Sequence, residues 1–313
     1  MKKSTVTALL KVTVSVLLIL SLFKVFPEIK QISGIIKLKN SYIIPAVIMM
    51  LLSIFVQSVK WFYLLKTSGC GTSFKDAFLS LSAGLALGFI TPGRAGELAR
   101  GAFIKTGSNS DKILLSFLDR YFLFMITVLF TLISTASAFL FFNIPSAQAV
   151  LIIVVSMILL IILLLPFSSD FKNRLMKKAI SEHHAGLIPD LSDEKFAVTI
   201  ALSNIHFLCV FFVFYFIADG VTGVGMGHSL LAFTLMMFVI TVLPFTFANI
   251  GTRDWSVILG LRTIPAFFFV PSHTVIPSAS EAIAVSLVFF FINIVIPAAG
   301  GLLVVVFHRI FIK

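Results

Sequence analysis

Residues 91–100 read Thr91-Pro92-Gly93-Arg94-Ala95-Gly96-Glu97-Leu98-Ala99-Arg100, and this segment is the most informative one in the chain. Its two arginines and its glutamate follow directly on residues 80–89, which are all apolar or small. An ionisable group at membrane depth costs about 2.5–3.5 kcal/mol on insertion scales, so such groups face a cavity, a partner or a substrate. The proline and the glycine interrupt a helix at the same point. Interrupted backbone is tolerated at that depth only inside protein or against a wet cavity.

The composition identifies an integral membrane protein. Of the 313 residues, 59% are hydrophobic and 12% are charged, whereas an ordinary soluble domain carries about 25% charged residues. The longest polar window, 168–195, is too short for a soluble domain, so we expect residues 1–313 to form one membrane domain without a soluble enzyme domain. The net charge of +11 fits basic loops and contact with anionic lipid head groups. Nucleic-acid binding would need a basic soluble face and is not expected.

Long apolar runs predict an all-α, polytopic membrane protein with six to eight spans, because each crossing needs about 20 residues. The uninterrupted runs lie at about 8–26, 42–65, 113–142, 147–168, 196–218 and 281–307. Two further apolar stretches, 76–103 and 228–272, contain prolines, glycines and charged residues. We expect the first to be a re-entrant helical hairpin. The second is either a hairpin of the same kind or a pair of crossings.

The basic residues of the loops set the orientation, because cytoplasmic loops are rich in lysine and arginine. The loop 169–195 has five such residues, and the loop 143–147 carries no charge. Together with basic residues near both ends, this pattern predicts cytoplasmic N- and C-termini in a plasma or inner membrane. The loop 27–41 contradicts the pattern, because it would lie outside with three lysines. In this orientation the stretch 76–103 enters and leaves from the cytoplasmic side, and a hairpin at 228–272 does so from the outside.

The two interrupted stretches share an order of residues. Each has an apolar lead-in followed by a proline, a glycine, an arginine and a carboxylate, and a further carboxylate follows on or near the next span. These residues are Pro92, Gly93, Arg94, Glu97 and then Asp119 in the first half, and Pro244, Gly251, Arg253, Asp254 and then Glu281 in the second. The order is typical of an inverted repeat with its site near the bilayer midplane. We expect the two halves to span about 42–168 and 196–307.

Arg94, Glu97 and Arg100 form the first candidate binding site. Their spacing of three places them on one helix face if a helix starts after Gly93. An arginine fork binds a phosphate bidentately, and a helix N-terminus adds free N–H groups and a positive dipole end. A glutamate between two arginines leaves one positive charge in excess, which favours a seat for a phosphate head group. The alternative is a structural cluster of ion pairs that holds the hairpin together.

Asp119 and its neighbour Arg120 lie early in a span. Asp119 either turns inward to meet Arg94 or Arg100, or forms with Arg120 an interfacial pair that snorkels to the cytoplasmic surface. Adjacent positions on a helix point about 100° apart, so Asp119 and Arg120 are not expected to face the same cavity.

In the second half, Arg253 and Asp254 repeat the arginine and carboxylate of the first hairpin. Glu281 is a further candidate for the site. It also has a structural interpretation, because Ser278 and Glu281 have the spacing of a capping box that opens the last span. The candidate substrate site therefore consists of Arg94, Glu97, Arg100, Asp119, Arg253, Asp254 and Glu281.

No cofactor or metal site is expected. Cys70 and Cys209 lie in different segments, and no spacing of cysteines and histidines suggests a metal ligand set. The chain also lacks the sequence pattern of a catalytic triad, a P-loop or an HExxH site.

The segment Pro92-Gly93-Arg94-Ala95-Gly96-Glu97-Leu98-Ala99-Arg100 resembles the lysylphosphatidylglycerol synthase transmembrane region family. Its members are flippase-like integral membrane proteins similar to the membrane domain of the multiple peptide resistance factor. The stretch from Ser280 to Pro297 resembles the last helix of that family, and the length and number of spans agree. The resemblance implies translocation of a lipid or handling of its head group. It does not imply lysyl transfer, because the aminoacyl-transfer domain of the fused synthase has no counterpart in residues 1–313.

Two functional hypotheses follow. In the first, the chain is a flippase that moves an anionic phospholipid or a polyprenyl-linked lipid, and it has no enzymatic activity. The three site arginines would hold the phosphate, and Glu97, Asp119 and Asp254 would balance the charge and release it. In the second, the chain is a membrane-embedded transferase that acts on a lipid phosphate, or a subunit that delivers lipid to one.

Overall fold

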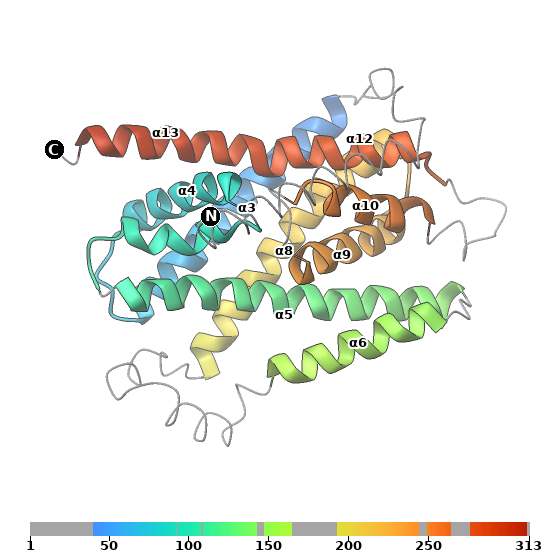
Figure 1. The fold of residues 1–313 in the computed structure, drawn as a ribbon, viewed down its shortest axis with the longest axis horizontal. Helices are drawn as coiled ribbons and strands as arrows, with labels where there is room; N and C mark the ends of the chain where they lie inside the picture. Colours follow the sequence, from blue (N-terminus) through green and yellow to red (C-terminus); the bar gives the residue numbers. More distant parts are fainter. Residues whose placement is uncertain are drawn as a thin grey trace, which may run out of the picture.

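The structure is a computed structural model that describes residues 40–91, 93–107, 109–142, 147–164, 193–243, 249–263 and 276–311. All regular structure within these ranges is helical, which agrees with the predicted all-α class (Figure 1). The predicted span at 8–26 lies outside the described residues, as do Pro92, Pro244 and Pro265.

Four helices of the described part are long and apolar enough to cross a membrane. They are α3 (Asn40–Thr67), α5 (Asn109–Phe142), α8 (Asp193–Thr222) and the C-terminal helix. The last consists of α12 (Ala279–Phe290), the π-helical segment η5 (Phe291–Val295) and α13 (Ile296–Phe311). These four match the runs predicted at 42–65, 113–142, 196–218 and 281–307. The chain is an integral membrane protein.

The hydrophobic core lies where α8 packs against α3, α9 and α12. Phenylalanine rings from α8 and the neighbouring helices fill it, and Phe207, Phe214 and Phe233 are at most 1% exposed. Phe207 stacks on Phe130 of α5 with ring centroids 4.7 Å apart. On the far side of α5 lies α6 (Ala147–Leu164), which pairs with α5 along one edge of the molecule (Figure 1).

The stretch 76–103 forms a helical hairpin interrupted where the sequence predicted. Helix α4 (Phe74–Ile90) ends at Thr91, and the 3₁₀-helix η2 (Ala95–Phe103) packs back along it. The loops at the two ends of the hairpin meet, since Thr106 donates a hydrogen bond of 3.1 Å to the carbonyl of Gly71. The chain therefore leaves the hairpin on the side where it entered. A re-entrant course through the bilayer stays a prediction.

A second interruption separates α9 (Met226–Val242) from α10 (Thr252–Ile258) and the π-helical segment η4 (Leu259–Thr263). Positive φ angles at Asn249 (59°) and Gly251 (86°) turn the chain before α10. Both α10 and η4 pack against α9, and a Cβ on Gly260 would lie 2.5 Å from the Cα of Ala232. Residues 264–275 lie outside the described part, so the choice between a hairpin and two crossings stays open.

Two neighbouring elements hold the first hairpin. Helix α13 packs along α4, and the two approach so closely that a Cβ on Gly301 would lie 1.9 Å from the carbonyl oxygen of Ser82. On the other side, η2 packs against α5. Figure 1 shows this arrangement, with α4 lying between α13 and α5. The charged residues of η2 are thereby positioned inside the helix bundle.

Candidate functional site

The 3₁₀ geometry of η2 aligns the charged residues of the first hairpin. A 3₁₀-helix has three residues per turn, so side chains three apart lie in one row. Glu97 and Arg100 belong to η2, and Arg94 precedes it as the N-cap, in the left-handed conformation with φ of 57°. Arg94 and Glu97 form an ion pair. The shared face that the spacing predicted is therefore present.

A buried ion cluster lies at the inner end of this row. Asp119 of α5 accepts from Lys60 Nζ of α3 at 2.8 Å and from Arg100 Nη2 at 2.7 Å. The three side chains are only 1–3% exposed. Lys60 also donates to Ser203 Oγ at 3.2 Å, and the Arg100 guanidinium lies 4.0 Å from the ring centroid of Trp61. Of the two interpretations of Asp119, the inward one is what the structure shows.

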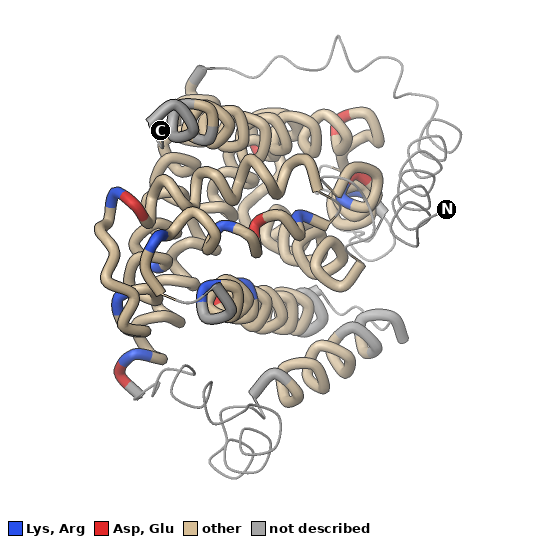
Figure 2. Tube along the Cα trace, turned by 60° about the vertical axis from the view of Figure 1, so that its left-hand side comes forward, with Lys and Arg blue, Asp and Glu red and all other residues tan. Residues whose placement is uncertain are grey.

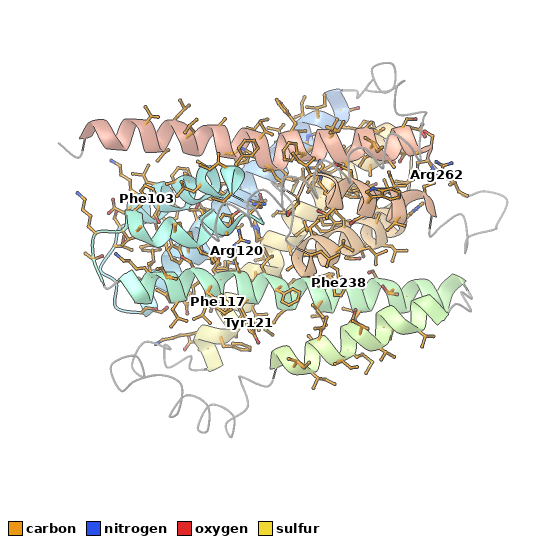
Figure 3. The ribbon with its side chains drawn as sticks, viewed as in Figure 1. Phe103, Phe117, Arg120, Tyr121, Phe238 and Arg262 are labelled. Carbon is orange, nitrogen blue, oxygen red and sulfur yellow. The ribbon has the colours of Figure 1, made fainter. Side chains whose placement is uncertain are left out.

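The outer end of the row carries a second ion cluster. Glu97 pairs with both Arg94 and Arg120, and Arg120 Nη2 donates to the carbonyl oxygen of Arg94 at 3.1 Å. The arginine side chains are 23% and 35% exposed, whereas that of Glu97 is 8% exposed. Figure 3 shows Arg120 reaching from α5 toward the hairpin. Two partly exposed arginine side chains thus flank one buried carboxylate.

Asp119 and Arg120 of α5 join different ion clusters. Adjacent helix positions point in different directions, and from this we expected the two residues not to face the same cavity, which stays a prediction. The structure brings both to η2, because η2 packs along α5 and contacts it at two levels. Asp119 reaches Arg100, whereas Arg120 reaches Glu97, one 3₁₀ turn earlier. The long arginine side chain spans the angular difference.

Lys60 is a member of the site that the sequence reasoning missed. It lies inside the apolar run 42–65, which was interpreted only as a span. The available signal was the lysine itself, since an ionisable residue in the middle of a span indicates a buried partner or a functional site. Its partner, Asp119, belongs to another helix and could not be identified from spacing along the chain.

Glycines on α4 allow η2 to lie close to it. A Cβ on Gly88 would lie 2.6 Å from Glu97 Cγ, and a Cβ on Gly84 would lie 2.6 Å from Arg100 Cβ. The side chains of Glu97 and Arg100 therefore occupy the space that a side chain at Gly88 or Gly84 would fill. Substitution of either glycine would push the row away from α4.

The backbone at the start of η2 is less free than expected. We expected unpaired N–H groups there to contribute to anion binding. Thr91 Oγ1 accepts from Gly96 N at 2.7 Å, and Glu97 N donates to the carbonyl oxygen of Arg94 at 3.1 Å. These two N–H groups are engaged within the hairpin, so the arginine side chains are the main donors that the site offers.

The second interrupted stretch carries a compact, neutral cluster. Arg253 Nη2 lies 2.7 Å from Asp254 Oδ1, and Arg253 Nε donates to Ser286 Oγ at 2.8 Å. Ser286 donates in turn to Asp254 Oδ1 at 2.5 Å, and Gly251 N donates to Asp254 Oδ2 at 3.0 Å. Arg253 and Asp254 are 1% and 4% exposed. This cluster fastens α10 to α12.

Glu281 forms the capping box predicted for the last span. Ser278 N donates to Glu281 Oε2 at 2.7 Å, and Glu281 N donates to Ser278 Oγ at 3.2 Å. The capping interpretation is therefore what the structure shows. Contact between Glu281 and a substrate stays a prediction.

An aromatic contact connects α4 of the first hairpin to α12. Phe89 of α4 stacks on Phe290 of α12 with ring centroids 6.2 Å apart, and the Arg253 guanidinium lies 4.3 Å from the ring centroid of Phe290. Phe89 directly follows Gly88, on which Glu97 packs. Figure 2 shows charged residues gathered at one end of the molecule and continuing from there into its interior. A single polar chamber shared by both clusters stays a prediction.

The family assignment can now be made. The sequence profile of the family described as "Lysylphosphatidylglycerol synthase TM region" matches residues 8–301. The chain belongs to this family. The match confirms the resemblance drawn from residues 92–100, and it gives the protein a membrane role connected with lipid. A search of the curated proteins found no match.

The ion clusters around η2 and the Arg253–Asp254 cluster differ in their capacity to bind a ligand. In the Arg253–Asp254 cluster the carboxylate and Ser286 engage Nη2 and Nε of the guanidinium, which is 1% exposed, while Arg253 Nη1 has no hydrogen-bond partner in the described part of the chain. The cluster around η2 has more cations than carboxylates, and two of its cations are partly exposed. It is therefore the better candidate for binding an anionic ligand.

Proposed function

We propose that this protein is a lipid flippase that binds the anionic head group of a phospholipid or a polyprenyl-linked lipid. The observation that carries the proposal is the pair of partly exposed arginine side chains, Arg94 and Arg120, beside Glu97 at the break of an apolar hairpin. A guanidinium fork matches phosphate oxygens bidentately. Family membership supports a lipid as the ligand.

In this proposal the residues of the first hairpin have two roles. Arg94 and Arg120 contact the phosphate, because their side chains retain exposed surface. Arg100, Asp119 and Lys60 are buried and hold η2 against α3 and α5. Glu97 competes with the phosphate for both arginines, which gives the bound head group a route of release.

In this proposal the second interrupted stretch provides the phosphate-binding arginine, Arg253, for the opposite leaflet. Arg253 is the arginine that sequence order pairs with Arg94, and the inverted repeat would present it from the other side of the membrane. In the described state Asp254 and Ser286 engage it. The proposed cycle therefore alternates between a state in which the arginines of the first cluster are free to bind the phosphate and a state in which Arg253 is free to bind it.

We also propose cytoplasmic N- and C-termini and a plasma or inner membrane location, because basic residues gather in the loops assigned to that side.

The proposal describes a transporter without enzymatic activity. A transferase would need a nucleophile or base within reach of the lipid phosphate. The described charged residues around η2 are engaged in ion pairs, and the hydroxyl that Lys60 contacts, Ser203 Oγ, is fully buried and belongs to the inner cluster, not to the outer one with its partly exposed arginine side chains. The transferase hypothesis is tested by incubating the purified protein with lipid and an activated donor. A new covalent product in the mass spectrum would replace the flippase proposal.

The direct test is a flipping assay with the full chain reconstituted in liposomes that contain a fluorescent phosphatidylglycerol. Dithionite bleaches the outer leaflet, so the bleached fraction reports lipid movement. We expect Arg94→Glu to reduce movement to the level of protein-free liposomes, because the charge reversal repels the phosphate. Lys66→Glu is the matched control, since Lys66 is exposed at the end of α3. Unchanged movement with Arg94→Glu, in protein that folds normally, would refute the assignment.

A further inference from the structure

We infer that the preferred head group carries a doubly charged phosphate, that is, a phosphomonoester or a diphosphate, and not a singly charged phosphodiester. The inference rests on the proposed function and names the substrate class of the same site. Its basis is the charge of the ion clusters around η2.

The first step is the charge count. The cations of the two clusters are Lys60, Arg94, Arg100 and Arg120, and the carboxylates are Glu97 and Asp119. The described groups therefore leave two positive charges in excess. Each carboxylate is shared by two cations, so the excess is distributed along the whole row.

The second step is burial, which prevents water and salt from cancelling this excess. The side chains of Lys60 and Arg100 are 1% and 2% exposed, and they share the single carboxylate of Asp119. Buried charges interact more strongly than exposed ones and are screened less by salt. An anion that brings two negative charges to the row neutralises the site, whereas a singly charged anion leaves one buried cation uncompensated.

The third step is the supply of donors. Arg100 Nε and Arg120 Nε are buried and have no hydrogen-bond partner in the described part of the chain. Buried donors are almost always paired in folded proteins, so Arg120 Nε, which belongs to a side chain proposed to contact the phosphate, indicates a missing acceptor, whereas Arg100 Nε belongs to the inner cluster. A phosphomonoester offers three terminal oxygens and carries a charge of about −1.5 to −2 at pH 7. A phosphodiester offers two terminal oxygens and one charge, so it brings fewer acceptors and less charge to the row.

The experiment compares short-chain lipids that differ in the phosphate. The purified full chain in detergent is titrated with dihexanoyl phosphatidic acid, dihexanoyl phosphatidylglycerol or dihexanoyl phosphatidylcholine at pH 8, and Kd is measured by thermophoresis. We expect phosphatidic acid to bind at least about tenfold more tightly than phosphatidylglycerol, because one further charge-assisted hydrogen bond contributes that order of affinity. Phosphatidylcholine is expected to bind most weakly.

Variants connect the preference to the row. Arg120→Gln should reduce the preference for phosphatidic acid to about threefold or less, and Arg94→Gln is a second variant with the same expected effect. Lys66→Gln removes one positive charge from an exposed position of α3 and should leave the preference unchanged. An unchanged preference in both arginine variants would overturn the inference.

A pH series separates the charge of the ligand from titration of the protein. The second ionisation of a phosphomonoester has a pKa of about 6, so its affinity should rise between pH 5 and 8. Phosphatidylglycerol does not change charge in this range. The titratable groups near the row, namely Glu97, Asp119, Lys60 and His206, act on both lipids, so only the difference between the two curves reports the second phosphate charge. Parallel curves would contradict the inference.

The outcomes distinguish the inference from the proposed function. Equal affinity for phosphatidic acid and phosphatidylglycerol refutes the doubly charged head group and leaves the flippase proposal standing. Absence of binding by either lipid refutes the proposed function itself. Inorganic phosphate is added as a competitor. If it displaces phosphatidic acid at equal concentration, the site binds free phosphate, and the assignment to a lipid is wrong.

Discussion

Replacing the buried carboxylate of the inner cluster, Asp119→Asn, should strongly destabilise the fold. Asp119 accepts from Lys60 and Arg100 at 2.8 and 2.7 Å, and all three side chains are at most 3% exposed. The amide keeps the size of the side chain but removes its charge, so both cations stay buried without a counter-ion. Breaking a buried ion pair by removing one partner costs about 3–5 kcal/mol. That is a large part of the total stability of a protein, which is about 5–15 kcal/mol.

The measurement is the free energy of unfolding in mixed micelles, with SDS as the denaturant and tryptophan fluorescence as the signal. Trp61 reports on the cluster directly, because its ring lies 4.0 Å from the Arg100 guanidinium. The control is Glu194→Gln, which removes one negative charge from an exposed position of α8 and should change the free energy by less than about 0.5 kcal/mol.

A double variant tests the physical reason for the loss. Lys60→Met combined with Asp119→Leu replaces two of the ionic partners by apolar side chains. The double variant still leaves Arg100 without its carboxylate, but it removes the buried Lys60 cation, so one buried cation is uncompensated in place of two and the double variant should be more stable than Asp119→Asn. A loss below about 1 kcal/mol for Asp119→Asn, or a double variant less stable than the single one, would refute the reasoning.

The remaining predictions concern helix contacts and a helix cap. Gly301→Ala should lower the free energy of unfolding by about 1–3 kcal/mol, because the added Cβ would lie 1.9 Å from the carbonyl oxygen of Ser82. Gly300→Ala is its control, since nothing lies within 4 Å of that position, and thermal unfolding of both variants checks the difference. Ser278→Ala should cost about 1 kcal/mol, because it removes the cap that accepts from Glu281 N. The same variant should flip lipid at the normal rate, and a loss of flipping without a loss of stability would show that the cap has a functional role.

The helices and the first interruption could be predicted because they depend on local properties of the sequence. Apolar runs of sufficient length gave α3, α5, α8 and the C-terminal helix. The interruption after α4 followed from the Pro-Gly pair, and Gly93 indeed adopts a positive φ of 59°. The spacing of three between the charged residues also gave their common face. That spacing fits both an α-helix and a 3₁₀-helix, so the tighter geometry of η2 could not be chosen in advance.

The partners of these residues could not be predicted, because they come from other helices. Lys60 and Asp119 belong to α3 and α5, and only the packing of η2 between its neighbours brings them together. The pairing of Arg120 with Glu97 could not be predicted for the same reason, since helix geometry gives the angle of a side chain but not the position of the neighbouring helix. The occupied N–H of Gly96 depends on Thr91, whose side chain turns back across the break.

Phe290 connects the two interruptions. Arg253 of α10 lies against its ring, and Phe89 of α4 stacks on the same ring. An aromatic pair of this kind contributes about 0.5–1.5 kcal/mol beyond its burial, and a cation over a ring adds a similar amount. We therefore expect a tilt of α4 away from α12 to separate the rings and to weaken the support of Arg253, so that a displacement at one interruption would reach the other.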